Sequence, residues 1–321
     1  MKKLEDLSFI PHWVSHLGCI DGCLRYLGLG VSTPWLYGGT GHAFIINISK
    51  DSCPSGPTAW KTEMLFSLGK NLGYSMDGFF AHKSMPDFDE KRKLSWNHVK
   101  ESIDVGYPCY GWQIGNIADF YTIYGYDDIG YYYKGYSQEE GAGPKPWDEI
   151  GESEIGVIEM HSVRPGTPST DRETVKEALE FVLKHSEGPD KWIFPNYRSG
   201  LQGYTIWIDG IKEGVASVAG LGYNAAVWGE CRRYAVEFLI EAKERLRGLD
   251  QEFDVATEYY SIVSDTMEKL AKIYPFSGPT DFSVTVSDRE KRERAVECLE
   301  VVRENEELGL ELLQEIVKKL S

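Results

Sequence analysis

The side chains best suited to nucleophilic or acid–base chemistry lie in the first 45 residues of the chain. Ser15 and Cys19 are one helical turn apart in a segment whose apolar residues recur at helical spacing, and His16 lies beside them. His42 follows the glycine-rich segment 38–41, whose backbone N–H groups could hold an anion. A thiolate at a helix N-terminus can attack a carbonyl group, because the helix dipole and a nearby imidazolium lower the pKa of the thiol. These residues are therefore the first candidates for a catalytic site.

The same residues also have structural interpretations. Ser15 is a good N-cap residue for a helix that begins there. Cys19 and Cys23 are suited to the buried face of that helix, because free cysteines behave as small apolar residues. His42 begins an apolar run that predicts a strand, where its ring would make a structural hydrogen bond.

The order of elements predicts an α+β domain over residues 1–165 and a helical domain over residues 166–321. After Pro168 the apolar period changes from 2 to 3.6, and Thr170–Glu173 forms a capping-box sequence. Strands followed by helices are typical of an α+β domain joined to an α-helical bundle. In the first domain we expect helices from residue 15 and over 87–104, strands over 42–48, 74–81, 107–113, 119–126, 131–135 and 155–160, and a loop over 137–146.

Three short motifs in the first domain resemble a known family. The expected first helix ends in Arg25-Tyr26-Leu27-Gly28, and a later strand ends in Gly125-Tyr126-Asp127, after a Gly-Tyr-Pro sequence at 106–108. This order resembles the papain-like cysteine peptidases that process bacteriocin leaders, and the N-terminal domain of the butirosin biosynthesis protein H family of acyltransferases. The resemblance implies an antiparallel sheet with an N-terminal helix. It also implies a Cys at the start of the helix and a His at the start of the strand.

The chain departs from this family at both catalytic positions. The family spacing places Ser15 where the Cys is expected and Asp119 where the His is expected. A carboxylate of ordinary pKa is too weak a base to activate a hydroxyl group. The resemblance therefore implies a papain-like fold in which cysteine-peptidase chemistry is absent.

Polar and aromatic residues in the second domain recur at four-residue spacing. Asn224, Trp228 and Arg232 share one helical stripe, and Tyr223 lies beside it. This stripe could face the first domain and close a pocket. A salt-bridged seam that only holds elements together is an equally good interpretation.

Two functions remain open. The first is a protein without peptidase activity that binds a small molecule or an acyl or peptide-like group in a cleft between the two domains. Its ligand-binding residues would be His16, Trp112, Gln113, Tyr223, Asn224, Trp228 and Arg232, beside Ser15, Cys19, His42 and Asp119 at the former catalytic centre. The alternative is an acyltransferase or amide hydrolase with Cys19 or Ser15 as nucleophile and His16 or His42 as base.

Composition narrows the classes of partner. The net charge of −16 disfavours nucleic acids and anionic membrane surfaces, both of which require a basic face. The cysteines lack zinc spacing and the glycines form no nucleotide-binding motif, so we expect neither a metal nor a cofactor.

The start of the chain has no signal-peptide pattern and no apolar stretch is long enough for a membrane helix, which predicts a cytoplasmic protein. The apolar stripes of the C-terminal helices could form a homodimer interface.

Overall fold

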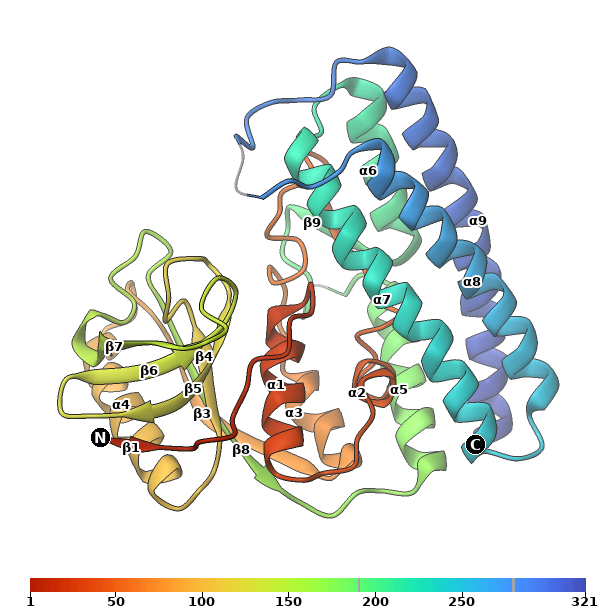
Figure 1. Cartoon of the computed structure of the whole chain (residues 1–321). Helices are drawn as coiled ribbons and strands as arrows, with labels where there is room; N and C mark the ends of the chain where they lie inside the picture. Colours follow the sequence, from red (N-terminus) through yellow and green to blue (C-terminus); the bar gives the residue numbers. More distant parts are fainter. Residues whose placement is uncertain (190, 279–280) are drawn as a thin grey trace. The chain divides into compact units, whose positions relative to one another are not determined.

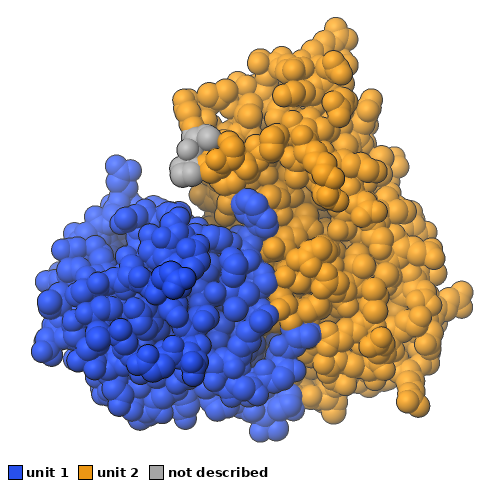
Figure 2. Space-filling model, viewed as in Figure 1, with its two compact units in different colours: residues 1–32, 72–168 blue, residues 33–71, 169–321 orange. Residues whose placement is uncertain are grey.

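The chain folds into two compact units, each built from two separate segments. The computed structural model describes residues 1–189, 191–278 and 281–321. The first unit contains residues 1–32 and 72–168, and the second contains residues 33–71 and 169–321 (Figure 2). The boundary at residue 168 lies close to the expected one. The expected division differs at residues 33–71, which pack with the C-terminal helices.

An antiparallel sheet forms the centre of the first unit. Its strands are β1 (Lys2–Lys3), β3 (Tyr74–His82), β4 (Cys109–Trp112), β5 (Phe120–Tyr126), β6 (Gly130–Lys134), β7 (Ala142–Pro146) and β8 (Val157–Pro165). The strand order is β3-β8-β4-β5-β6-β7, with β1 beside β5 (Figure 1). The expected hairpin between β5 and β6 is confirmed, because the Asp127 carboxylate accepts the N–H groups of Ile129 and Gly130 in the turn.

Two helices pack on this sheet. Helix α1 (Ser15–Tyr26) contacts β5, β4 and β8, and helix α4 (Phe88–Asp104) contacts β3 and β8. Ser15 is the first helical residue, so its expected role as N-cap is wrong. Val14 occupies the N-cap position without a side-chain hydrogen bond to the helix. The side chain of Ser15 is therefore available for other contacts.

One expected loop of the first unit contains a strand. Residues 137–146 are rich in glycine and proline, yet β7 pairs with β6 over the second half of this segment. Proline is tolerated there because β7 lies at the edge of the sheet, where missing N–H donors leave no neighbouring strand unpaired. The short helix η2 (Trp147–Glu149) follows directly.

Helices dominate the second unit. They are α2 (Thr33–Gly39), α3 (Met64–Gly69), α5 (Asp171–Ser186), α6 (Gly200–Glu213), α7 (Val218–Arg245), α8 (Asp250–Ile273) and α9 (Arg289–Leu320), with the short helix η1 (Lys70–Leu72) after α3. Helices α6 to α9 run alongside one another (Figure 1). The capping box at Thr170 is confirmed at the start of α5. In the described parts of the chain, no helix is both long and apolar enough to cross a membrane.

The segment between α2 and α3 differs from its expected structure. Only β2 (Asn47–Ser49) forms from the expected strand 42–48, and it pairs with β9 (Tyr197–Ser199). Residues 42–46 form a turn and an irregular segment, and residues 33–39 form α2, which was not expected from the sequence. Pro34 is the second residue of α2, a position where its missing N–H group breaks no helical hydrogen bond.

A buried ion pair connects this segment with three helices. The Arg232 guanidinium of α7 donates to both carboxylate oxygens of Glu306 in α9 at 2.9 Å, and to the hydroxyl of Tyr204 in α6 at 3.0 Å. Its remaining N–H groups donate to the carbonyls of Ala43 and Ile45 at 2.9 Å. Arg232 is fully buried, and these bonds satisfy its guanidinium on every side.

We expect Arg232→Met to destabilise the protein by about 3–5 kcal/mol, because Glu306 would remain charged and buried with the Tyr204 hydroxyl as a hydrogen-bond donor but without a cationic partner. Urea unfolding followed by circular dichroism measures this loss. The double variant R232M/E306L should recover a large part of it. The matched control is Arg233→Met, because the half-exposed ion pair of Arg233 with Glu237 contributes at most about 1 kcal/mol. Equal losses in R232M and R233M would contradict the role given to Arg232.

Candidate functional site

The N-terminus of α1 meets the start of β5 through the side chain of Ser15. The Ser15 hydroxyl donates a hydrogen bond to the Asp119 Oδ1 atom at 2.7 Å and accepts the N–H group of Phe120 at 3.1 Å. Ser15 is only 3% exposed. The structure thus brings Ser15 and Asp119, 104 residues apart in the sequence, into direct contact.

The loop between β4 and β5 fixes the position of Asp119. The Gln113 N–H group donates to the Asp119 carbonyl at 2.7 Å, which extends the β4–β5 ladder by one pair. Gln113 has φ +51°, in the left-handed region that only a minority of non-glycine residues adopt. Its side-chain oxygen accepts a hydrogen bond from the Ser153 hydroxyl at 2.8 Å, which stabilises this backbone turn. Gln113 thus supports the loop that carries Asp119.

His16 and Trp112 lie in the same region. The His16 ring stacks on Phe120 at a centroid distance of 4.0 Å, and its Nε2 atom is 2.9 Å from the Tyr110 hydroxyl. This nitrogen therefore bonds to Tyr110, not to Ser15. Trp112 packs edge-on against Phe120 at 5.1 Å, and its indole N–H group has no hydrogen-bond partner in the described residues.

The electrostatic environment of Asp119 is unusual. Burial raises its pKa to about 6, while the hydrogen bond from Ser15 opposes this rise. Among the described residues, no basic side chain forms an ion pair with Asp119. At pH 7 the carboxylate is mostly ionised and accepts the Ser15 proton in a hydrogen bond. It remains far too weak a base to remove that proton.

Cys19 has the features of a structural thiol. It is 0% exposed, and burial raises its pKa well above the ordinary value, with further contributions from Cys23 and Asp119. The thiolate, which is the reactive form, is thus strongly disfavoured. These observations favour the structural interpretation of Cys19 over its role as a nucleophile.

The remaining predicted site residues come together in the second unit. The His42 ring lies 6.4 Å from Trp228, and its Nδ1 atom is 3.8 Å from the Cys231 sulfur. The side-chain amide of Asn224 donates to the carbonyls of Ser52 and Cys53 and accepts the Trp228 indole N–H at 3.2 Å. The stripe is therefore a buried seam between α7 and the preceding segment of its own unit.

His42 and Tyr223 also lie in the second unit, and His42 is beside the middle of the stripe, at Trp228. Burial lowers the pKa of His42 to about 4, with a smaller effect from the Arg232 charge, so its imidazole is neutral at pH 7. The Tyr223 ring contacts Phe276 at 5.2 Å. His42 belongs to the second unit, whereas Ser15, His16, Cys19, Trp112, Gln113 and Asp119 belong to the first.

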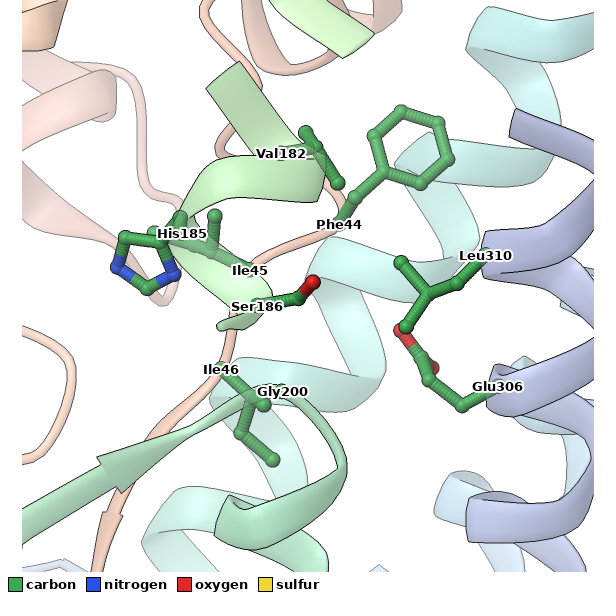
Figure 3. Close-up of a pocket in the computed structure, with 9 residues that line it drawn as sticks. All are labelled: Phe44, Ile45, Ile46, Val182, His185, Ser186, Gly200, Glu306 and Leu310. Atoms are coloured by element: carbon green, nitrogen blue, oxygen red, sulfur yellow. The ribbon is translucent and has the colours of Figure 1, made fainter. Parts of the chain in front are cut away.

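The sequence analysis did not single out His185, which lines a narrow pocket in the second unit that has no room for a water molecule. The other lining residues are Phe44, Ile45, Ile46, Val182, Ser186, Gly200, Glu306 and Leu310 (Figure 3). His185 is fully buried, neither ring nitrogen has a hydrogen-bond partner in the described residues, and burial lowers its pKa to about 3. Its ring points away from Glu306 in Figure 3. One feature of the sequence could have indicated that His185 is buried. It lies three residues after Val182, on the apolar face of α5.

Neither metal chemistry nor a matching protein identifies the site. The described residues contain no group of three His, Cys, Asp or Glu side chains that could hold a metal ion. Comparison of the chain with models of protein families and with curated proteins found no match. The resemblance to papain-like proteins therefore remains a prediction that rests on the motifs and on the geometry of Ser15 and Asp119.

The raised pKa of Asp119 predicts a pH-dependent effect of Asp119→Asn. The folded state holds the proton more tightly than the unfolded state, so the cost of burying the carboxylate is present above about pH 6 and is lost as the pH falls toward 4. Above pH 7 we expect D119N to be more stable than the wild type by about 1–2 kcal/mol, a value reduced for the partial exposure of the carboxylate.

Urea unfolding at pH 8, 6 and 4.5 measures this difference, which should shrink at the lowest pH. Asp128→Asn, which removes an exposed carboxylate of the same unit, controls for the change in net charge. A difference between D119N and the wild type that is the same at all three pH values would contradict the prediction.

The burial of Cys19 predicts that it resists alkylation. In native protein treated with iodoacetamide at pH 7.5, we expect the partly exposed Cys53 and Cys298 to react first. Cys19 should react about 100-fold more slowly than in urea-unfolded protein, which peptide mapping by mass spectrometry measures. Rapid and selective labelling of Cys19 would instead support its role as a nucleophile.

Proposed function

We propose that the first unit is a papain-like domain that binds a small molecule or an acyl or peptide-like group without cleaving it. The hydrogen bond between Ser15 and Asp119 carries this proposal. It occurs at the first residue of α1 and at the residue before β5, which are the positions of the nucleophile and the base in the family that the motifs resemble.

The chemistry of this pair argues against bond cleavage. A cysteine peptidase needs a thiolate and an imidazole that returns a proton to the leaving group. Ser15 offers a hydroxyl of much higher pKa, and Asp119 offers a carboxylate whose pKa of about 6 remains too low to ionise it. His16 is the nearest imidazole in sequence, and its Nε2 atom bonds to Tyr110.

The surroundings of the pair favour ligand binding. Binding sites combine apolar and aromatic surface with a few polar groups that fix orientation. Trp112 and Gln113 are both partly exposed and adjoin the loop that carries Asp119. The indole N–H of Trp112 has no partner in the described residues but is itself buried, so the ligand would contact the partly exposed face of the Trp112 side chain and not this N–H group.

The alternative function is an acyltransferase or amide hydrolase with Cys19 or Ser15 as nucleophile. It has less support, because Cys19 is a fully buried thiol and Ser15 is only 3% exposed. The hydrogen bonds of Ser15 to Asp119 and Phe120 also direct its hydroxyl into the structure.

A single acyl probe tests the proposal, with octanoyl-N-acetylcysteamine thioester as the ligand. We expect wild-type protein to bind it reversibly and to leave the thioester intact. NMR signals of the Trp112 indole and the Gln113 amide should shift during the titration. The double variant S15C/D119H should become acylated at position 15, because its imidazole can take the thiol proton and return it to the departing N-acetylcysteamine thiolate. Intact-mass spectrometry and peptide mapping measure the adduct.

The single variant S15C is the matched control, because it has the thiol without the imidazole. Acylation of S15C/D119H no faster than that of S15C would contradict the papain-like placement of residues 15 and 119. Thioester hydrolysis by the wild type that is lost in Ser15→Ala would establish the alternative function. Unshifted Trp112 and Gln113 signals would contradict ligand binding at this site.

A further inference from the structure

We propose that the ligand of the first unit carries an organic cation, an ammonium group, which pairs with the Asp119 carboxylate beside Trp112. This inference rests on the proposed function and names the chemical class of the ligand. It starts from the partners of the buried carboxylates in the chain.

Among the residues that the structure describes, the two most deeply buried carboxylates, Asp21 and Glu306, both have cationic partners. Asp21 in α1 accepts hydrogen bonds from Arg25 at 2.7 Å and lies 3.0 Å from the His12 Nε2 atom. Glu306 pairs with Arg232 through both of its oxygens. Such pairing is the rule, because an ionised carboxylate removed from water is costly unless a cation or several hydrogen bonds compensate it.

Asp119 departs from this rule. Most of its surface is covered, yet its side chain receives only the neutral hydroxyl of Ser15, on the Oδ1 atom. In the described residues, Oδ2 accepts no hydrogen bond and no Lys, Arg or His pairs with the carboxylate. Asp119 nevertheless remains partly exposed, so its unpaired charge is accessible to a small molecule.

The neighbouring residues suit an organic cation better than other ligands. An anion would be repelled by the carboxylate and by the net charge of −16. A metal ion requires several donors, and the described residues offer no group of three. The partly exposed Trp112 ring can cover the apolar part of a ligand and attract its charge through the ring face.

Three probes of one shape separate charge from apolar contact: phenethylammonium, 2-phenylethanol and phenylacetate. NMR titration of the whole chain, observed at the Trp112 indole and the Gln113 amide, gives the dissociation constant of each. We expect phenethylammonium to bind at least about tenfold more tightly than 2-phenylethanol, and phenylacetate to bind most weakly. In Asp119→Asn the ammonium should bind only as tightly as the alcohol, whose affinity should not change.

Two further variants separate the carboxylate from its surroundings. Asp128→Asn makes the same change in net charge at an exposed position and should retain the preference for the ammonium probe. Ser15→Ala removes the hydroxyl but keeps the carboxylate, so it should also retain the preference. The same NMR spectra show whether each variant is folded.

Equal affinities for the ammonium and the alcohol, or an unchanged preference in D119N, would overturn this inference. If the alcohol or the octanoyl thioester still shifted the Trp112 and Gln113 signals, the proposed ligand-binding function would stand without the cation. If no probe shifted these signals, both the function and the inference would be wrong.

Discussion

A carboxylate removed from water needs a compensating charge or several hydrogen bonds, and much of this structure is arranged to meet that need. In the second unit, Glu306 of α9 is matched by Arg232 of α7, whose other N–H groups bind the carbonyls of Ala43 and Ile45. One guanidinium thus positions two helices and an irregular segment together. In the first unit, Asp21 is matched by Arg25 within α1 and by His12 before the helix. Without these pairs, each of the two buried carboxylates would carry an uncompensated charge.

At Asp119 the same need is met only in part, and the proposed role of the site depends on this difference. The Ser15 hydroxyl uses its single proton for the carboxylate and a lone pair for the Phe120 N–H group. These bonds attach the start of α1 to the start of β5, which stabilises the fold. They also engage the atom that a hydrolase would need to present to its substrate. A residue that holds two elements together in this way is poorly placed to act as a nucleophile. The proposed binding of an organic cation instead uses the Asp119 carboxylate, whose charge is not paired with any basic side chain in the described residues.

The sequence predicted those features that depend on local pattern. The capping box at Thr170, helix α4 and the hairpin after β5 are all encoded within a few neighbouring residues, and all three are present. Strand β7 was missed because glycine and proline argue for a loop, and edge pairing overrides that preference. The stripe of Asn224, Trp228 and Arg232 followed from helical spacing. The pairing of Arg232 with Glu306 could not be predicted in this way, because 74 residues separate the two and no local pattern relates them.

The hardest feature to predict was the division of the chain, and its cause lies in close backbone contacts. Residues 33–71 precede the main strands of the first unit in sequence, so pattern alone assigns them to it. In the structure a Cβ atom on Gly38 would lie 2.0 Å from the Phe238 ring, and one on Gly220 would lie 2.0 Å from the Ser52 carbonyl. Both glycines are required for α2 and the following loop to approach α7 this closely. Because these contacts form between residues 200 and 168 positions apart, they are visible only in three dimensions. They make the second unit dependent on a segment that the chain supplies before most of the first unit's sheet.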